Sequence, residues 1–363
     1  LSGSDDGVVI LWDALAGRER DRLEGHSGPV QAVAISPNGR TAVSGGRAGD
    51  SPTDPGELIL WDLETGREIR RLEGTTAEVM DVAFTQDGGA ILASSGGSEQ
   101  WVNLGLPVEL SMSLWDVETG EVTRSFDLAD DDAISLAISP DGSTALSGSW
   151  DRTVYLWDLA TGQRLGAFEG HTDPVNALAF GPNPGSRRAI SGSNDSSLIL
   201  WDLVSGEPVA RLRASDSDIL DLVISPDGRT ALSASRDGAL IQWDLDDGGE
   251  LGRFEGHGSG VFDVAFSPDG QQLLSSGGSA DPGAPTAGDN SIRLWDLATA
   301  QEIGRLEGHE GVVMQVAFSP DGQSALSAST DLTVRLRDVA TGEIERTMNH
   351  DAPPTSIAFS PDG

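Results

Sequence analysis

The chain of 363 residues contains no cysteine, and all 23 of its basic side chains are arginine, so lysine is absent too. The lack of cysteine excludes disulfides, thiolate nucleophiles and zinc sites with sulfur ligands. The lack of lysine excludes a P-loop, a kinase-type lysine and Schiff-base chemistry. Several large classes of enzyme are therefore ruled out before any motif is considered.

Long hydrophobic runs are missing as well. No stretch of the chain approaches the roughly 18 apolar residues of a membrane span, and no charged segment followed by an apolar one opens it. We therefore expect no membrane partner and a cytoplasmic protein. Hydrophobic residues make up 37% of the chain, against 46 glycines and 18 prolines. Together with many short β-branched runs, this composition predicts an all-β fold with tight turns.

Positive charge is scarce. The chain has 58 acidic residues against its 23 arginines, which gives a net charge of −35 at pH 7. Such a charge repels phosphate backbones and anionic lipid, so we expect neither nucleic acid nor a membrane surface as a partner. The acidity has two interpretations: it reflects solubility and adaptation to salt or genome composition, or it attracts a basic partner.

The dipeptide Trp-Asp recurs along the whole chain. The tryptophans of this series are Trp12, Trp61, Trp115, Trp157, Trp201, Trp243 and Trp295, and Arg337 with Asp338 continues it. Successive members are 49, 54, 42, 44, 42, 52 and 42 residues apart, so the basic unit has about 42 residues and three copies are longer. A period of this length predicts a repeat architecture.

Each unit carries the signals of four short strands. Residues 175–180 form an almost continuous apolar run, which is typical of a strand buried on both faces. In other units Ser-Pro-Asp-Gly follows this run, and Asp-Gly after proline is turn chemistry that closes a hairpin. A second strand ends in Ser-x-Ser, a third runs into Trp-Asp, and a turn leads to a fourth, more polar strand such as 305–308. Four antiparallel strands repeated eight times predict a β-propeller.

Two signatures in these units resemble those of the WD40-repeat family over essentially the whole chain. They are Gly-His before the first strand and S-x-S-x-D-x-x-[VI]-x-L-W-D across the second and third strands. The resemblance implies a single all-β propeller domain covering residues 1–363, with eight four-stranded blades. Seven blades plus part of a neighbouring propeller is the alternative.

The two ends of the chain look like complementary halves of one blade. Residues 1–13 match the second half of a unit, and residues 349–363 match the first half. Three residues, equivalent to 143–145, would join residue 363 to residue 1, which also suggests a segment cut from a longer chain. We therefore predict that strands from both termini pair in one blade and remove the exposed edges of an open ring.

All five histidines occupy one position of the repeat. In the WD40 family this position belongs to a buried structural tetrad of His, Ser, Asp and Trp, and the resemblance transfers the tetrad to residues of this chain. They are His171, Ser191, Asp195 and Trp201 in one unit, His257, Ser275, Asp289 and Trp295 in another, and His350, Ser2, Asp6 and Trp12 across the two ends. Indole, hydroxyl, imidazole and carboxylate can form one chain of hydrogen bonds inside a β core.

Some units depart from this tetrad. Thr76, Ala129 and Ser215 lie at or near the histidine position of their units, and Arg337 replaces a tryptophan. We expect these blades to depend more on packing, and the blade of the third unit to be the least regular.

Serine, histidine and aspartate in one unit also fit a catalytic triad. Their recurrence together with tryptophan, in a core, favours the structural interpretation. With every histidine assigned, none is left for a metal or a general base, so we expect no catalytic residue, no metal and no cofactor. Calcium held by carboxylates alone, for example at the three aspartates 130–132, is the remaining alternative.

The long insertions all fall between the second and third strands. The serine near the end of the second strand lies 10 residues before the tryptophan position in five units, but 17, 21 and 20 residues before it in the other three. The inserts are 47–57, 96–111 and 277–290, and in the WD40 family this connection shares a face with the Gly-His loops. Long loops on one face of a repeat scaffold are a usual place for binding. Trp101 and Trp150 on this face fit no repeat position, so each either anchors a partner or packs its own loop.

A second candidate surface is the repeat position five residues after the histidine. Its residues are Gln31, Met80, Ile134, Asn176, Leu220, Phe262, Met314 and Thr355, of which five are apolar. In the WD40 family this position rings the mouth of the central channel. The apolar side chains either receive a side chain of a partner or form an upper core layer, and on the sequence alone we favour the core.

These observations predict a noncatalytic scaffold or sensor propeller. We expect it to recognise a protein or peptide, with a basic one favoured by the acidity, through the face that carries the long loops. The first alternative is an architectural module of a larger assembly. The second is a propeller enzyme of hydrolase or lyase type, for which a bound ion or a buried cluster of acids in the channel would be evidence.

Overall fold

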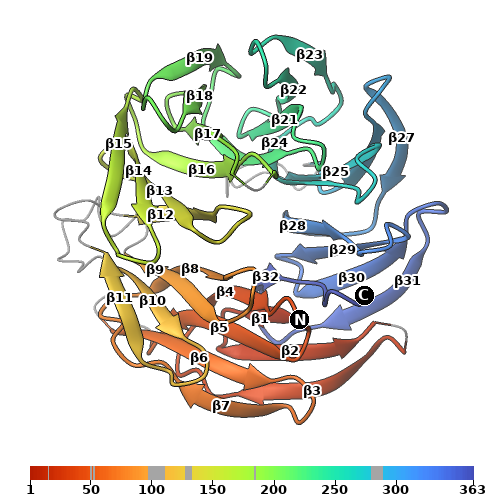
Figure 1. The fold of residues 1–363 in the computed structure, drawn as a ribbon. Coiled ribbons are helices and arrows are strands. Elements are labelled where there is room, and N and C mark those ends of the chain that lie inside the picture. Colours follow the sequence, from red (N-terminus) through yellow and green to blue (C-terminus); the bar gives the residue numbers. More distant parts are fainter. Residues whose placement is uncertain are drawn as a thin grey trace.

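Eight sheets of four antiparallel strands form a ring in the computed structural model of the chain (Figure 1). The structure describes residues 1–363 except 15, 50, 52–53, 97–110, 127–132, 184 and 279–288. All elements of the described residues are strands, and no helix among them is long and apolar enough to cross a membrane. The predicted all-β propeller of eight blades is confirmed, and the ring does not consist of seven blades plus part of another.

Each blade has an inner, a second, a third and an outer strand, counted from the axis of the ring outward (Figure 1). The inner strands are β4 (Val30–Ile35), β8 (Val79–Phe84), β12 (Ala133–Ile138), β16 (Val175–Phe180), β20 (Ile219–Ile224), β24 (Gly260–Phe266), β28 (Val313–Phe318) and β32 (Pro354–Ile357). The second strands are β1 (Ser2–Ser4), β5 (Thr41–Arg47), β9 (Ala90–Ser95), β13 (Thr144–Ser149), β17 (Arg188–Ser193), β21 (Thr230–Ser235), β25 (Gln272–Gly278) and β29 (Ser324–Ser329). The third strands are β2 (Val8–Asp13), β6 (Gly56–Asp62), β10 (Ser111–Asp116), β14 (Thr153–Asp158), β18 (Ser197–Asp202), β22 (Leu240–Asp244), β26 (Ile292–Asp296) and β30 (Thr333–Asp338). The outer strands are β3 (Arg18–Glu24), β7 (Arg67–Arg71), β11 (Val122–Phe126), β15 (Arg164–Glu169), β19 (Pro208–Arg213), β23 (Glu250–Arg253), β27 (Gln301–Leu306) and β31 (Ile344–Asn349).

Blade 1 consists of β32, β1, β2 and β3, and blades 2 to 8 follow in chain order from β4–β7 to β28–β31. The predicted inner strand 175–180 is confirmed as β16. The predicted fourth strand 305–308 was placed too late, because β27 already begins at Gln301, directly after the turn, and ends at Leu306. Blade 3 has the same four strands as its neighbours within the described residues, so the irregularity predicted for it does not lie in the strand order of its sheet. It lies in the polar core, where Trp115 does not bond to the serine of its blade.

The core lies between the blades rather than within one sheet. The second and third strands are almost wholly buried because neighbouring blades cover both of their faces, as in β17 and β18. The outer strands are mostly exposed, and most of them bury one apolar side chain near their end, such as Leu212 of β19. One hydrophobic cluster, for example, joins Leu146 and Phe168 of blade 4 to Val175 and Trp201 of blade 5. Each blade therefore depends on its neighbours for burial of its apolar surface.

Strands from the two ends of the chain close the ring. In blade 1, β1 pairs with β32 so that Ser2 lies opposite Ile357, and Gly3 lies opposite Ser356. The backbone of Leu1 extends this pairing, since its nitrogen donates to the carbonyl oxygen of Ala358 at 2.9 Å and its carbonyl oxygen accepts from the nitrogen of Ala358 at 2.9 Å. The closure predicted from the complementary half-units is thus formed as an antiparallel pair.

The turn between the third and the outer strand of each blade packs on the preceding blade. Gly342 in this turn has φ of 72°, and a Cβ atom there would lie 3.2 Å from Cδ2 of Leu306 in blade 7. Blade 7 itself has Ala300 at this place, with φ of 53°. A left-handed conformation is strained for alanine but not for glycine.

Replacing Ala300 with glycine is expected to stabilise the protein by about 1 kcal/mol. The strain energy that alanine has in the left-handed conformation is larger than the additional entropy that glycine loses on folding. The reciprocal change Gly342→Ala should destabilise it by a similar or larger amount. Equilibrium unfolding in urea measures both differences. An Ala300→Gly protein less stable than its parent would contradict the assignment of strain to this turn.

Candidate functional site

The polar core of blade 5 is one chain of hydrogen bonds. Trp201 donates its indole Nε1–H to Oγ of Ser191 at 2.8 Å, and this hydroxyl lies 2.8 Å from Nε2 of His171. Nδ1 of His171 lies 2.9 Å from Oδ2 of Asp195, which also accepts the backbone N–H of Thr172 at 2.8 Å. Burial raises the pKa of Asp195, but the bonds from His171 and neighbouring donors outweigh burial and hold it well below its usual range. The structure therefore brings all four predicted residues of this unit together.

Blade 7 has the same chain with an extension. His257 lies 2.7 Å from Ser275 and 2.9 Å from Asp289, and Trp295 donates to Ser275 at 2.8 Å. Arg293 continues the chain, since its guanidinium lies 2.7 Å from the carboxylate of Asp289 and 2.5 Å from that of Glu302 on the outer strand. The tetrad of this blade is thus tied to its exposed edge by a buried arginine.

Blade 1 joins residues from both ends of the chain, but only three of the predicted four. Oγ of Ser2 lies 3.0 Å from Nε2 of His350 and accepts the indole N–H of Trp12 at 2.7 Å. Asp6 does not bond to His350. Its carboxylate accepts the hydroxyl of Ser4 at 2.6 Å and the backbone N–H of Val8 at 3.1 Å, and Nδ1 of His350 is buried with no partner among the described residues. The prediction for Asp6 was wrong because the short turn folds its side chain back onto its own backbone.

Blade 2 has the histidine, serine and tryptophan of the tetrad, with a glutamate in place of the aspartate. His26 lies 2.7 Å from Ser44, and Trp61 donates to Ser44 at 2.7 Å. The carboxylate nearest Nδ1 of His26 belongs to Glu57, 3.4 Å away, but the two make no hydrogen bond, and Nδ1 is buried without a hydrogen-bond partner among the described residues. Burial raises the pKa of Glu57, but the nearby His26 and the two hydrogen bonds from Ser27 outweigh burial and lower it to about 2. Glu57 lies four residues before its tryptophan, whereas Asp195 lies six before, so the longer side chain compensates for a different register.

In blade 8 an arginine replaces the tryptophan. His309 lies 2.9 Å from Ser327 and 2.8 Å from Asp331, so the inner part of the tetrad is intact. Arg337 is 2% exposed and donates through Nη2 to the carbonyl oxygen of Glu307 at 2.7 Å. Burial, and then the charge of Arg335, lowers the pKa of Arg337 to about 10.

The blades without histidine satisfy their tryptophans in other ways. In blade 4 Trp157 donates to Ser147 at 2.8 Å, and the hydroxyl of Tyr155 donates to Asp151 at 2.5 Å in place of a histidine. In blade 6 Trp243 donates to Ser233 at 2.9 Å. In blade 3 Trp115 donates instead to the backbone oxygen of Glu73 at 3.1 Å, and its serine, Ser94, has no partner among the described residues.

The serine, histidine and tryptophan of the blade 5 tetrad are closed off from solvent. Ser191 and Trp201 are 0% exposed, and the side chain of His171 is 0% exposed as well. No group of three or more histidine, aspartate and glutamate side chains within the described ranges could hold a metal ion, and the aspartates 130–132 lie outside those ranges. The tetrads therefore act as polar cross-links within the blades.

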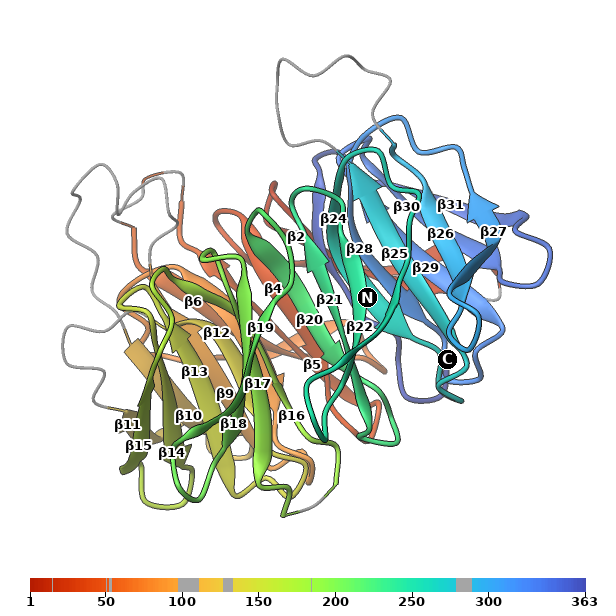
Figure 2. The same ribbon diagram turned by 90° about the horizontal axis from the view of Figure 1, so that it is seen from above.

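Antiparallel pairing brings the loop before each inner strand and the connection between the second and third strands to one side of the ring, here called the top face (Figure 2). Trp150 lies on this face, in the turn after β13. Its side chain is half-buried, and its indole N–H is buried with no hydrogen-bond partner among the described residues. Trp101 lies outside the described residues.

The apolar side chains five residues after the histidine position line the top of the inner strands. Met80, Leu220 and Phe262 are partly exposed, and Met314 is 37% exposed. None of these four belongs to a hydrophobic core cluster, so the upper core layer favoured on the sequence is not formed by them. Ile134 lies in β12, and its side chain is outside the description.

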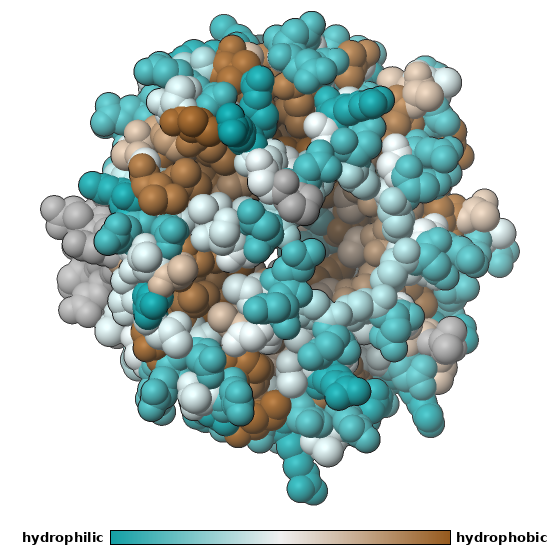
Figure 3. All heavy atoms as spheres, viewed as in Figure 1, coloured by the Kyte–Doolittle hydropathy of each residue, from teal (hydrophilic) through white to brown (hydrophobic). Residues whose placement is uncertain are grey.

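Polar residues at the same repeat position are already engaged. Gln31 donates to Glu78 at 3.0 Å, and Asn176 donates to the side chain of Asn194. Thr355 donates to the carbonyl oxygen of Val30 at 2.5 Å. The described residues at this repeat position whose side chains make no hydrogen bond are therefore the apolar ones. Three of them, Leu220, Phe262 and Met314, lie on the consecutive inner strands β20, β24 and β28. Figure 3 shows the ring from the face opposite the top face, where a hollow lies at its centre.

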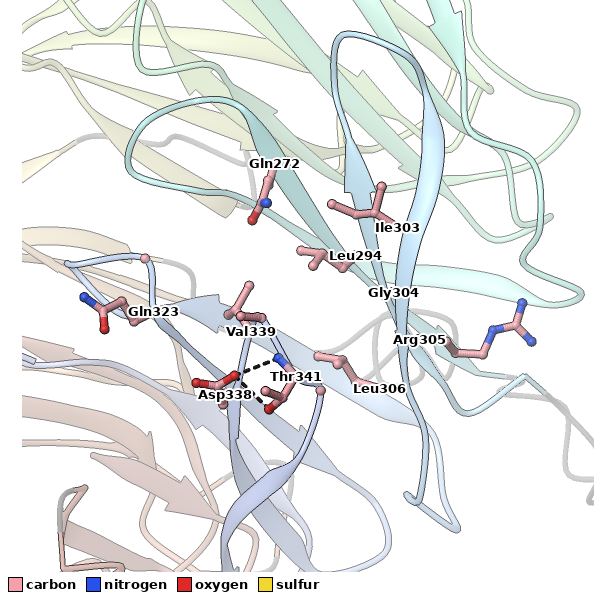
Figure 4. Close-up of a pocket in the computed structure, with 13 residues that line it drawn as sticks. Gln272, Leu294, Ile303, Gly304, Arg305, Leu306, Gln323, Asp338, Val339 and Thr341 are labelled. Atoms are coloured by element: carbon pink, nitrogen blue, oxygen red, sulfur yellow. Dashed lines mark hydrogen bonds between the residues drawn. The ribbon is translucent and has the colours of Figure 1, made fainter.

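A separate groove of about 460 Å³ runs between blades 7 and 8, away from the top face. Its apolar wall is formed by Leu294, Ile303, Leu306 and Val339, and Gln272 and Gln323 lie beside it (Figure 4). Its one acidic lining residue, Asp338, is used within its own turn, where it accepts the hydroxyl of Thr341 at 2.8 Å. The groove therefore offers shape but no reactive group.

A family model described as WD domain, G-beta repeat matches most of the chain. The matched segments are 17–62, 120–158, 162–202, 206–244, 248–296 and 300–338. The chain belongs to the WD40-repeat family. The Gly-His and Trp-Asp signatures of this WD40 propeller are the residues through which the family was expected from the sequence.

Curated relatives match parts of this WD40 propeller. Eukaryotic translation initiation factor 3 subunit I of Scheffersomyces stipitis is 35% identical over 77 residues, which are 21% of this chain and 22% of that protein. Small ribosomal subunit protein RACK1y of Oryza sativa subsp. japonica is 37% identical over 87 residues, 23% and 26% of the two chains. Guanine nucleotide-binding protein subunit beta of Zea mays is 26% identical over 191 residues, 50% and 47%. The match thus spans between a fifth and a half of the length of these relatives.

The two histidines with the most strongly shifted pKa make the WD40 propeller sensitive to acid. Burial lowers the pKa of both His309 and His350 to about 4, although nearby carboxylates partly oppose it. In the unfolded chain these histidines bind their protons near pH 6.5, whereas in the folded protein they bind them only near pH 4. The folded state therefore has its full stability above pH 6.5 and loses stability relative to the unfolded chain as pH falls toward 4. We expect each histidine to cost about 2 kcal/mol of unfolding free energy between pH 7 and pH 4.5. Urea unfolding at the two pH values measures the loss. The variant His350→Asn should lack the part of the loss that comes from His350, about half of the total for the two histidines. An unchanged pH dependence in that variant would contradict the assignment.

Proposed function

We propose that this WD40 propeller is a noncatalytic recognition platform that binds a protein or peptide segment at the top face, over the mouth of the channel. The observation that carries the proposal is the exposure of Leu220, Phe262 and Met314 on three consecutive inner strands. Apolar side chains that no core cluster covers are a natural seat for an apolar side chain of a partner. Met80 and Ile134 on β8 and β12, and Trp101 and Trp150 in the connections of the same face, complete the proposed surface.

The charge of the chain supports a partner with basic residues. A net charge of −35 attracts cationic segments over several ångströms and accelerates their encounter at low salt. The same charge disfavours nucleic acid and anionic membranes, which stay excluded in this proposal. The predicted location stays the cytoplasm.

An architectural role in a larger assembly is the second candidate. It is favoured by the names of the relatives, which describe a subunit of an initiation factor, a protein of the small ribosomal subunit and a subunit of a guanine nucleotide-binding protein. In that case the top face would be covered permanently. A stable monomer that releases and rebinds a peptide would favour the recognition platform.

Peptides selected against the folded propeller from a random library test the proposal. Affinities of the selected peptides, measured by calorimetry, are expected to fall at least tenfold with Phe262→Ala and with Trp101→Ala or Trp150→Ala, with melting unchanged. Val204→Ala is the matched control, because Val204 is 69% exposed in the turn between the third and outer strands, on the opposite face. Equal losses with Val204→Ala, or unfolding of the three aromatic variants, would remove the support for anchors on the top face.

A further inference from the structure

A buried ion pair lies at the base of the first long insert, residues 47–57, on the top face. Nη1 of Arg47, at the end of β5, lies 3.3 Å from Oε1 of Glu78, which directly precedes β8. Arg47 is 8% exposed and Glu78 2%. The pair therefore joins blade 2 to blade 3. Because both charges are removed from water, they need further hydrogen bonds to stabilise them.

Both charges of the pair have such bonds. Arg47 donates through Nε to the carbonyl oxygen of Gly49 at 2.9 Å, inside the insert. Gln31, at the repeat position that rings the channel mouth, donates to the same Oε1 of Glu78 at 3.0 Å. Burial and the charge of Asp5 raise the pKa of Glu78, and Arg47 and Gln31 oppose this rise by stabilising the ionised carboxylate. One carboxylate oxygen thus holds both the base of the insert and a residue of the mouth.

The carboxylate of Glu78 is an addition to the repeat. In each blade concerned, the residue before the inner strand accepts, through its carbonyl oxygen, the N–H of the residue at the end of the second strand. Pro29 accepts from Arg47 at 3.0 Å, Pro174 from Asn194 at 3.0 Å and Glu78 from Gly96 at 2.9 Å. Since proline serves this contact equally well, the contact does not explain a glutamate at this position. Gly96 opens the second insert, so Glu78 contacts the bases of two inserts.

The first insert is also held at its other end. Glu57 accepts both the N–H and the hydroxyl of Ser27 at 2.7 Å, and Nη1 of Arg71 lies 2.8 Å from its carboxylate. Between the two ends, Ala48 donates its N–H to the carbonyl oxygen of Pro55 at 2.8 Å and closes the insert. The insert is therefore a closed loop with a fixed point at each end, one of which is the ion pair.

We propose that the Arg47–Glu78 pair is a positioning device of the recognition platform, which fixes the first insert beside the channel mouth so that a peptide seated at the mouth also contacts the insert. Met80, in the surface proposed above, lies two residues after Glu78, and Gln31 occupies the same repeat position as Met80. The inference rests on the proposed function. Replacement of a buried ion pair by apolar side chains is often neutral or stabilising, so the role assigned to the pair is geometry rather than stability.

The double variant Arg47→Met with Glu78→Leu tests this role, because it removes both charges and keeps apolar side chains of similar volume. Its melting temperature is expected to equal or exceed that of the parent. Amide hydrogen exchange of the protein without peptide should show at least a tenfold loss of protection at Ala48. The affinity for the peptides selected against the folded propeller should also fall at least tenfold in calorimetry.

Arg236→Met is the matched control. Arg236 follows β21 at the repeat position of Arg47, and its N–H is likewise accepted by the residue before the inner strand, Asp218. Its Nε pairs with the carboxylate of Asp218 at 2.9 Å on the surface of one blade, where the connection to the third strand carries no insert. This variant should change neither the protection of Ala48 nor the affinity.

The outcomes separate the ion pair from the proposed function. Unchanged protection and affinity in the double variant would overturn the proposal. Lost protection with unchanged affinity would overturn the contact between insert and peptide and leave the recognition platform intact. If no peptide is selected, the proposed function fails, and exchange at Ala48 decides whether the pair holds the insert. If the double variant does not fold, nitrogen-15 NMR of the Arg47 guanidinium in the unaltered protein decides instead, since a freely rotating guanidinium would overturn the proposal.

Discussion

A chain that begins after Asp13 is expected to lose most of its stability and to aggregate. The deletion removes β1 and β2 and leaves β3 and β32 without their partners, so two strand edges are exposed. It also removes Val9, Ile10 and Leu11, which are 0%, 1% and 8% exposed. Burial of each such side chain is worth about 1.5 to 3 kcal/mol, so the total approaches the entire stability of an ordinary domain. Thermal unfolding and light scattering measure the two effects.

The matched control returns the same residues to the other end of the chain. Residues 1–13 attached after Gly363 through Ser-Thr-Ala, the sequence of 143–145, would complete a hairpin like that between β12 and β13. This rearranged chain should recover the melting temperature of the parent and remain monomeric. A truncated chain that is monomeric and melts like the parent would show that the terminal pairing does not hold the ring closed.

Trp201→Ala is expected to destabilise the protein by about 3 to 5 kcal/mol, the range for truncation of a fully buried tryptophan. Trp201 is 0% exposed and stacks on Phe168 with ring centroids 5.6 Å apart. Its indole N–H also ends the chain of hydrogen bonds through Ser191 to His171. Both packing and hydrogen bonding are therefore lost in the alanine variant.

Trp201→Phe separates these two contributions. Phenylalanine keeps an aromatic ring in the core but leaves the hydroxyl of Ser191 without its donor, so a loss of about 1 to 3 kcal/mol is expected. Urea unfolding of both variants gives the two free energies. If phenylalanine proves as costly as alanine, packing contributes little at this site; if neither change exceeds about 1 kcal/mol, the tetrad is not a stabilising cross-link.

The number of blades, their strands and the positions of the histidines could be predicted because they depend on the repeat. A residue type that recurs at one spacing, as His171 and His257 do, marks the same site in every blade. The tetrad acids were less predictable, because a side chain of different length can reach the same imidazole from another register. Glu57 approaches His26 in this way, from four residues before its tryptophan, where blade 5 has Ser197. A charged residue at this position of a buried strand was the sign of the substitution in the sequence. Asp6 shows the converse, an aspartate at the expected place that bonds within its own turn.

The hydrogen bonds in which a side chain of one inner strand accepts a backbone N–H of the next blade could not be read from the sequence for a related reason. Asp221, Asp263, Gln315 and Ser356 share a function as acceptors but not a residue type, so no motif marks the position. The bulge in the inner strand that frees each N–H group is likewise a property of strand pairing rather than of composition. The exposure of Phe262 and Met314 could not be predicted either, since a core layer and the wall of a channel have the same apolar pattern.

Hydrogen exchange of the propeller with and without a selected peptide is the most direct test of the recognition platform. The peptide is expected to protect the N-terminal ends of β20, β24 and β28 and the turn at Trp150, while the turn at Val204 exchanges as before. Protection confined to the turns of the opposite face or to the outer strands would contradict recognition through the top face.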